Sequence, residues 1–391
     1  EEAFALVRIV NVQIFDGEAV SDHTAIEFDE SRIVALGAEK VPTRDAIDGD
    51  GAWLLPGLID SHVHLELDPK VGTPPKPEDP RDLDAMAGRA REMVEAGITT
   101  ARDLGGGAWA EIEIRDRILA GEILGPRLLC AGQPITSTGG HCHFWGGEAA
   151  THAQALAVLQ RQLDHGVDLL KIMASGGRFT KNSDPSKAQF DLPFMKVMVD
   201  AANASNLTVA AHCHGSEAIR NAAHAGVTTI EHCSWVGSDG KWASDYQAEV
   251  VIEMARRGVW VSPTINAGWQ RFLTSDTPWL STFREIYTEM KSAGVKFVAS
   301  TDAGIPGVRH HDLPKALPVF ARLSGFSNAD VLSSATANAA DALGLQKTTG
   351  RIREGLAVDM LMVESSPIED LAVLQAPKAI WARGGEVKAL E

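Results

Sequence analysis

Apolar runs alternate with amphipathic stretches along most of the chain. Eight strand-like runs end near His62, Asp103, Ile135, Lys171, His212, His232, Thr264 and Asp302. Between them the spacing of apolar residues predicts helices over residues 82–96, 110–120, 153–165, 192–205, 216–225, 248–257 and 281–293. A glycine directly follows six of these seven stretches, as is typical of a helix C-terminus.

The regular alternation of strand and helix predicts an α/β fold with a parallel sheet. Eight repeats favour closure of that sheet into a (β/α)8 TIM-like barrel. The alternative is a doubly wound open sheet. We favour the barrel because polar residues stand at the C-terminal ends of nearly every strand, and in a barrel these ends meet at one mouth.

Both ends of the chain carry short strand-like runs separated by turns. They include the run from Ala5 to Phe15 near the start, and residues 350–352, 359–363 and 380–383 near the end. We therefore predict a small β-sandwich domain built from residues 1–55 and 346–391. Residues 56–345 would form the barrel, which we expect to be the metal-binding catalytic domain.

Composition narrows the range of partners. The chain has 391 residues, of which 45% are hydrophobic, and its formal net charge is -16. Such a charge argues against nucleic acid, and no apolar run is long enough to cross a bilayer. We expect a homo-oligomer that acts on a small molecule.

The cysteines indicate the cellular compartment. The four cysteines form no CxxC pair, so we interpret them as buried free thiols, which favours the cytoplasm. The chain begins at Glu1 without a methionine, so a signal peptide upstream is the alternative.

Two histidines follow the first strand of the predicted barrel. The apolar run 53–59 leads into His62 and His64, and side chains along a strand alternate between its two faces. The spacing therefore places both imidazoles on one face. Imidazole nitrogen binds zinc and its neighbours among the transition metals. This strand end is a candidate metal site, and the alternative is a pair of ordinary histidines after a buried strand.

Four further strand ends carry groups that bind or surround a metal, namely Lys171, His212, His232 and Asp302. Lys171 stands inside an apolar run, where an amine is costly unless it is neutral, paired or modified. The alternative is a lysine that reaches the surface. Taken singly, each of these residues could be a satisfied polar group. Taken together, at the ends of different strands, they point to one constellation. By contrast, we interpret the neighbours Arg102 and Asp103 as a structural ion pair near the rim.

This combined pattern resembles the metal-dependent amidohydrolase superfamily, whose HxH signature follows the first barrel strand. It is most similar to the imidazolonepropionase-like and prolidase-like subgroup, which has a lysine on the fourth strand. The resemblance covers essentially the whole chain. It implies two divalent metal ions, with zinc as the expected metal, held by His62, His64, Lys171, His212, His232 and Asp302.

The resemblance also implies how the ligands are shared and what they do. One metal would lie between His62, His64 and Asp302, the other between His212 and His232, and Lys171 would bridge them through a CO2-derived carboxylate. Metals that share a water lower its pKa, and the resulting hydroxide would attack the substrate carbonyl. Asp302 would take the water proton and pass it to the leaving nitrogen. No covalent enzyme adduct is expected.

Two loop residues are candidates for binding the substrate. By the same resemblance His141 contacts the substrate, and the alternative is a histidine in a surface loop. Arg178 could bind a substrate carboxylate through its guanidinium fork, or it could be a rim charge. Trp145, Trp235 and Trp269 follow strand ends and either wall an apolar pocket or pack in the barrel.

The expected function is hydrolysis of an amide or peptide bond in a small molecule with a free carboxylate. A dipeptide or an N-acyl amino acid fits, which corresponds to a dipeptidase, carboxypeptidase or amidase activity. The alternatives on the same scaffold are a mononuclear deaminase or cyclic amidase and a xenobiotic carbamate or anilide hydrolase. Lys171 argues against a single metal. The complete ligand set argues against a binding protein without catalytic activity.

Overall fold

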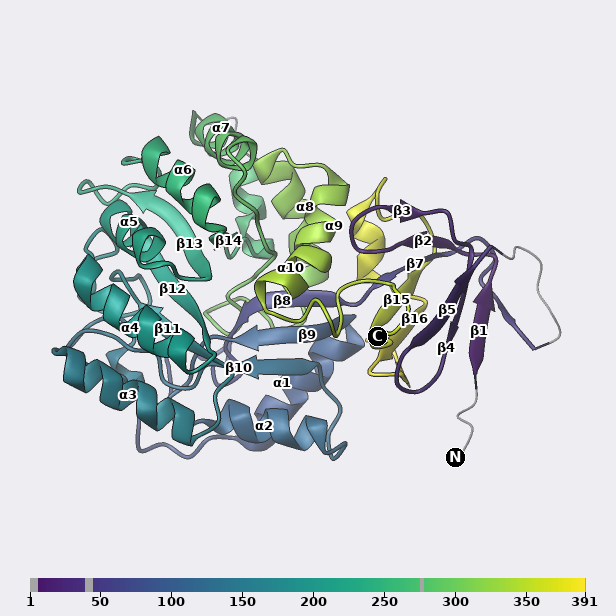
Figure 1. Cartoon of the computed structure of the whole chain (residues 1–391), viewed down its shortest axis with the longest axis horizontal. Helices are drawn as coiled ribbons and strands as arrows, with labels where there is room; N and C mark the ends of the chain where they lie inside the picture. The colour runs from purple at the N-terminus through teal and green to yellow at the C-terminus, as the bar shows by residue number, and fades with distance from the viewer. Residues whose placement is uncertain (1–5, 39–44, 275–277, 391) are drawn as a thin grey trace.

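The computed structural model describes residues 6–38, 45–274 and 278–390. The chain has an α/β fold, in which parallel strands alternate with helices through the middle and mostly antiparallel strands gather from both ends (Figure 1). Ala5, at the start of the first predicted strand, lies outside the described residues. So do residues 1–5, 39–44 and 391 of the predicted composite domain.

The strands of the middle region lie in two parallel sheets. One has the order β10-β9-β8 and the other the order β11-β12-β13-β14. These strands are β8 (Leu58–Val63), β9 (Ile98–Asp103), β10 (Arg127–Cys130), β11 (Leu169–Met173), β12 (Thr208–Gly215), β13 (Thr229–Val236) and β14 (Trp260–Ser262). All neighbours are parallel because the helical connections return the chain to the same end of the sheet.

The seven predicted helices are present and agree with the prediction to within three residues. They are α1 (Leu83–Glu95), α2 (Ala110–Leu119), α3 (His152–Asp164), α4 (Leu192–Ala204), α5 (Ser216–Ala225), α6 (Ala248–Arg257) and α7 (Pro278–Ser292). Asp82 and Asp191 cap α1 and α4 with their carboxylates. Gly226 and Gly258 end α5 and α6 in the left-handed conformation.

The structure also contains helices that the sequence pattern did not predict. They are α8 (Leu313–Ser324), α9 (Asn328–Ser334) and α10 (Ala337–Ala342), together with the 3-10 helices η1 (His143–Trp145), η2 (Ala267–Leu273) and η3 (Leu371–Gln375). α8 carries Pro318 in its interior, which hides a helical pattern. Among the helices of the described ranges, none combines the length and apolar character of a membrane span. The four cysteines are free and buried, as predicted.

The third predicted strand is shorter than expected. It was predicted to end near Ile135, whereas β10 ends at Cys130. Gly132 has a φ of 68° and Pro134 has no N–H, so the intervening segment cannot continue the ladder. Pairing resumes at Ile135, whose N–H donates to the carbonyl of Lys171 in β11 at 2.9 Å.

The eighth predicted strand, over residues 295–301, is not continuous. It pairs with β14 in an isolated bridge at Phe297. Beyond that point its N–H groups have other acceptors. Ala299 donates to the carbonyl of the last residue of α9 at 2.8 Å, and Thr301 donates to the Asp60 carboxylate at 3.1 Å. These acceptors replace the ladder that the apolar pattern predicted.

Strands from both chain ends share one six-stranded sheet of order β17-β16-β15-β7-β2-β3. Its members are β2 (Gln13–Phe15), β3 (Val20–Ser21), β7 (Trp53–Pro56), β15 (Met360–Val363), β16 (Ala379–Ala382) and β17 (Gly385–Val387). A four-stranded sheet lies beside it (Figure 1), formed by β1 (Val7–Val10), β4 (Ala25–Phe28), β5 (Ile33–Gly37) and β6 (Ile47–Asp48). Ile9 and Phe28 of the smaller sheet share a buried cluster with Leu54 and Met360 of the larger one. Residues 350–352, predicted as a strand, are irregular, with a bend at residues 350–351.

Candidate metal centre

The histidines at the end of β8 meet the aspartate that follows the eighth predicted strand. The Nε2 atoms of His62 and His64 are 3.3 Å apart. Asp302 Oδ1 lies 3.2 Å from the first and 3.3 Å from the second. Burial alone would raise the pKa of Asp302, but the neighbouring imidazoles, His62 foremost, hold this pKa well below its ordinary value. The site therefore presents two imidazoles and a carboxylate to one point.

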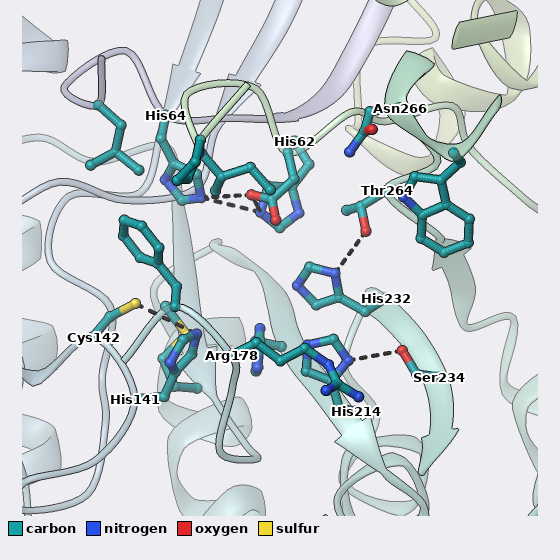
Figure 2. Close-up of a pocket in the computed structure, with 18 of the residues that line it drawn as sticks. His62, His64, His141, Cys142, Arg178, His214, His232, Ser234, Thr264 and Asn266 are labelled. Atoms are coloured by element: carbon teal, nitrogen blue, oxygen red, sulfur yellow. Dashed lines mark hydrogen bonds and ion pairs between the residues drawn. The ribbon is translucent and has the colours of Figure 1, made fainter. Parts of the chain in front are cut away.

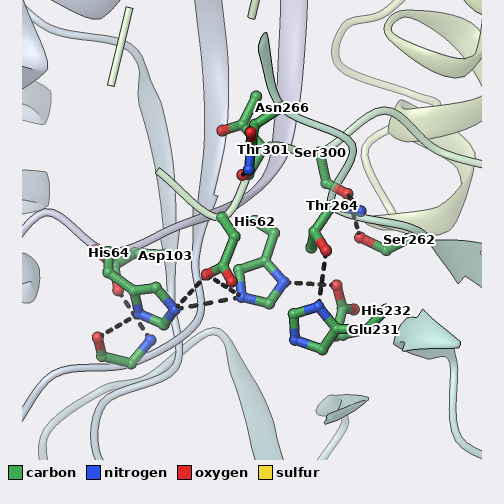
Figure 3. Close-up of polar contacts among 12 residues, drawn as sticks. His62, His64, Asp103, Glu231, His232, Ser262, Thr264, Asn266, Ser300 and Thr301 are labelled. Carbon is green, nitrogen blue, oxygen red and sulfur yellow. Dashed lines mark hydrogen bonds and ion pairs between the residues drawn. The ribbon is translucent and has the colours of Figure 1, made fainter. Parts of the chain in front are cut away.

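Hydrogen bonds orient both of these rings. His62 Nδ1 lies 2.9 Å from Glu231 Oε2, and His64 Nδ1 lies 2.9 Å from the carbonyl of Gly105 (Figure 3). Both partners are acceptors, so each Nδ1 carries the proton. The Nε2 atoms are left to face Asp302, and once any proton on them is displaced, their lone pairs and the carboxylate can bind one metal ion.

A second group of imidazoles comes from the ends of β12 and β13. One ring nitrogen each of His212, His214 and His232 lies within 4.8 Å of the other two. His232 also forms such a group with His62 and Asp302. The two groups therefore adjoin, with His232 between them.

The rings of the second group are also held by hydrogen bonds. His212 Nε2 lies 3.0 Å from the carbonyl of Gly176, so its Nδ1 is the free nitrogen. His232 Nδ1 lies 2.7 Å from Thr264 Oγ1. The Thr264 hydroxyl donates to the carbonyl of Pro263 at 2.7 Å, so it accepts from His232 and leaves the Nε2 of that ring free.

Strained backbone marks these strand ends. His232, Cys233, Thr264 and Asp302 have φ values of 68°, 55°, 57° and 61°. A left-handed conformation costs a non-glycine residue roughly 1–2 kcal/mol. Its concentration at polar residues around one point is typical of a functional site.

Lys171 of β11 is a buried amine at the same place. Its side chain is 1% exposed, and no residue in the described ranges forms a hydrogen bond or ion pair with it. Burial lowers the pKa of Lys171 below its ordinary value. The chain thus holds in its interior a lysine with an increased fraction of neutral amine.

Burial also disfavours the charged form of the other imidazoles of the cavity. Burial holds the pKa values of His212 and His232 well below the ordinary value. Burial likewise lowers the pKa of His141 to about 3 and that of His214 to about 4. Neutral imidazole is the form that binds metal.

A cavity of about 720 Å³ opens over this centre (Figure 2). The six predicted metal ligands line it, together with the aromatic side chains of Trp145, Phe179, Trp242, Trp269, Phe272 and Trp279. His141 and Arg178 line the cavity as well. His141 Nδ1 is held by Thr180 Oγ1 at 2.9 Å, whereas Arg178 is exposed. Trp235 instead is fully buried and packs against Tyr246.

Two features of the centre were not assigned correctly from the sequence: His214 received no role, and Arg102 was given the wrong partner. His214 lines the cavity with its Nδ1 held by Ser234 Oγ at 2.8 Å (Figure 2). Its spacing from His212 is the same i, i+2 signal that singled out the first pair. The predicted ion pair of Arg102 with Asp103 is wrong, because neighbours on a strand point to opposite faces. Arg102 pairs with Glu231 at 2.7 Å.

Gly304 permits the turn that brings Asp302 to the centre. Its φ is 109°, and a Cβ at this position would lie 2.5 Å from the carbonyl oxygen of His64. We expect Gly304→Ala to lower the free energy of unfolding by more than the roughly 1–2 kcal/mol of left-handed strain. Urea denaturation measures this. Gly307→Ala is the matched control, since its φ is 80° with no heavy atom within 4 Å. Equal decreases in the free energy of unfolding of the two variants would contradict a close contact between the added Cβ and the His64 carbonyl.

Comparisons with known proteins match nearly the whole chain. The model of the Amidohydrolase family matches residues 53–389. The ochratoxinase of Aspergillus niger is 27% identical over 377 residues, which cover 85% of this chain and 75% of that protein. A solved Xaa-Pro dipeptidase with methionine bound in its active site superposes with a TM-score of 0.83 at 26% identity, covering 98% and 99% of the two chains. The solved A. niger ochratoxinase shares the fold, with a TM-score of 0.81 at 23% identity and coverage of 99% and 96%.

Proposed function

The chain belongs to the amidohydrolase family, and from that premise we propose that it is a binuclear metallohydrolase that cleaves the amide bond of a dipeptide or N-acyl amino acid. Hydrolysis of amide C–N bonds follows from the family and its relatives. The number of metals and the substrate are the parts that we propose. The observation that carries the proposal is the set of free imidazole nitrogens around an ionised carboxylate and an unpaired buried lysine.

The residues present fit two divalent metal ions. His62, His64 and Asp302 would hold one ion, and His212 and His232 would hold the other. Zinc is the expected metal because it prefers imidazole ligands. Lys171 would bridge the two ions after its neutral amine adds CO2 and loses a proton, since the resulting carboxylate has two oxygens. The carboxylate of the modified lysine would be paired with the two ions, whereas the unmodified amine has no partner among the described residues.

The reaction needs a proton carrier beside the attacking water. Two bound divalent ions would lower the pKa of a water and polarise the scissile carbonyl. Asp302 is ionised, so it can take the proton of the attacking water and then donate it to the leaving nitrogen. His141 lines the cavity with its ring fixed by Thr180, which supports the role of substrate contact.

The cavity walls support a substrate with both an anionic and an aromatic group. Arg178 lines the cavity and would bind a free carboxylate through its guanidinium fork. Trp242, Trp269 and Trp279 offer flat apolar faces for an aromatic group. The solved Xaa-Pro dipeptidase among the relatives supports the dipeptide class. An aromatic amide or anilide is therefore the second candidate class of substrate.

We also infer that the parallel strands close into the (β/α)8 barrel. Isolated parallel bridges join Ile135 to Ile172, Val261 to Phe297 and Val63 to Ala303. They fall at the gaps between the two parallel sheets. Residues 56–345 would form this barrel. Residues 1–55 and 346–391 would form the β-sandwich, which the shared cluster of the two outer sheets supports.

Removal and return of metal test the proposal. We expect a chelator to abolish hydrolysis of N-acyl amino acids and dipeptides, including members with aromatic acyl groups. Two equivalents of Zn²⁺ per chain should restore it, because a complete site needs both ions. Full activity with one equivalent would support the mononuclear alternative instead. Inactivity across the panel with two ions bound would contradict the proposed substrates.

A further inference from the structure

Arg102 crosses the interior between strands that are not neighbours. It lies on β9, is 1% exposed, and its Nε donates to the carbonyl of Ser61 in β8 at 2.8 Å. Its Nη1 donates to Thr229 Oγ1 at 3.0 Å and its Nη2 to Glu231 Oε1 at 2.7 Å. The last two acceptors belong to β13, which lies in the other parallel sheet. The guanidinium therefore fixes the position of the β13 carboxylate relative to β8.

Glu231 has both carboxylate oxygens engaged. It is fully buried, and a buried carboxylate is costly unless it is paired and hydrogen-bonded. Oε1 accepts from Arg102 and from Thr229 Oγ1, the latter at 2.5 Å. Oε2 accepts from His62 Nδ1 at 2.9 Å (Figure 3). Arg102 thus holds the Glu231 carboxylate on one side. On its other side the carboxylate accepts a hydrogen bond from His62.

His62 differs in this respect from the other imidazoles of the cavity. In the part of the chain that the structure describes, five of them have an outward ring nitrogen that faces an uncharged oxygen atom. The oxygen is the carbonyl of Gly105 for His64 and of Gly176 for His212. It is a hydroxyl for the other three, from Thr180 for His141, from Ser234 for His214 and from Thr264 for His232. His62 alone faces a carboxylate there. A charged acceptor makes the stronger hydrogen bond and increases the electron density on the free nitrogen.

We propose that Arg102 and Glu231 are a positioning pair for the metal held by His62, His64 and Asp302. Glu231 keeps the His62 ring in one orientation with Nε2 free and makes it a stronger ligand, and Arg102 holds Glu231 in place. The inference rests on the proposed function to the extent that a metal must bind at His62. The affinity of this ion would therefore also depend on Arg102 of β9 and Glu231 of β13, which do not contact the ion.

Zinc affinities of the metal-free protein test the pair directly. A chromophoric chelator in competition with the protein gives the dissociation constants of both Zn²⁺ ions without an activity assay. We expect Glu231→Gln, which has nearly the same shape, to weaken one of the two ions by about 10–100-fold, the usual effect of losing such a partner. Arg102→Lys should act in the same direction on the same ion, because lysine lacks the fork that bonds Ser61, Thr229 and Glu231 together.

Asp359→Asn is the matched control. Asp359 is a buried carboxylate, 2% exposed, that pairs with Arg127 at 3.3 Å and accepts from Thr349 Oγ1 at 2.7 Å. Its loss should lower the melting temperature and leave both zinc constants unchanged. The control separates an effect on the metal from a general effect of breaking a buried ion pair.

The possible results discriminate between the claims. Wild-type constants for both ions in Glu231→Gln would overturn the positioning pair and leave the proposed function intact. An equal loss of zinc affinity in Asp359→Asn and Glu231→Gln would also overturn the positioning pair and leave the proposed function intact. If Glu231→Gln does not fold, Arg102→Lys decides in the same way. A wild-type protein that binds no zinc would overturn the proposed function itself.

Discussion

Lys171→Ala should remove most of the hydrolytic activity while the chain remains folded. Without a bridging carboxylate the two ions lose their shared ligand, and we expect metal content to fall toward one ion per chain. A metal ion stabilises the charge of the transition state by several kcal/mol. Since about 1.4 kcal/mol is tenfold in rate, kcat/KM should fall by at least about 10³-fold. Elemental analysis and steady-state kinetics on the purified variant measure both quantities.

The folded state should tolerate the loss of this lysine. The Lys171 amine has no hydrogen bond or ion pair within the described ranges, so its removal breaks no polar contact. Lys196→Ala is the control, because that lysine is exposed and pairs with Asp200 on its own helix. A short carboxylate such as acetate should partly restore metal and activity to Lys171→Ala by occupying the vacated space. Two bound ions and normal turnover without such rescue would contradict the bridge.

Asp302→Asn should lower kcat while retaining most of the metal. An amide keeps the shape of the carboxylate but cannot accept the proton of the attacking water. Loss of general acid–base catalysis costs about 10²–10⁴-fold in rate. His62 and His64 remain with their Nε2 atoms free, so binding of the first ion should persist with reduced affinity. Parallel measurement of kcat and zinc content separates the two effects.

The buried carboxylate of Asp312 provides the comparison for Asp302. Asp312 lies ten residues along the chain and pairs with Arg309 at 3.0 Å, away from the cavity lining. Its change to asparagine should leave kcat unchanged. Near-normal kcat in Asp302→Asn would remove that residue as the proton carrier.

The helices of the middle region were predictable because their signals are local. Apolar periodicity, a capping aspartate such as Asp82 and a terminal glycine such as Gly226 are contained within one helix and its flanks. α8 escaped prediction because Pro318 interrupts the pattern inside the helix. The eighth strand was predicted from its apolar run alone. The Asp60 carboxylate, which takes the N–H of Thr301 out of a strand ladder, lies more than two hundred residues away in the chain.

The centre was predictable to the extent that strand ends meet. The ligand candidates stand at the ends of strands, and a parallel fold with helical crossovers brings those ends together. The groups behind them were not predictable. Glu231 precedes His232 on β13, so its side chain points to the other face of the strand. Its partner on the imidazole side is His62, and only the completed fold places the two side by side. Strand alternation argues against Asp103 as the partner of Arg102, but nothing in the pattern around Arg102 points to Glu231.

The most direct test of the account is a crystal structure of the zinc-loaded protein with data collected at the zinc absorption edge. We predict two anomalous peaks within the cavity, one between His62, His64 and Asp302 and the other between His212 and His232. Continuous density for a carboxylate on Lys171 should lie between the peaks. A cavity without anomalous signal, or an unmodified Lys171 amine turned away from the metals, would contradict the central claim.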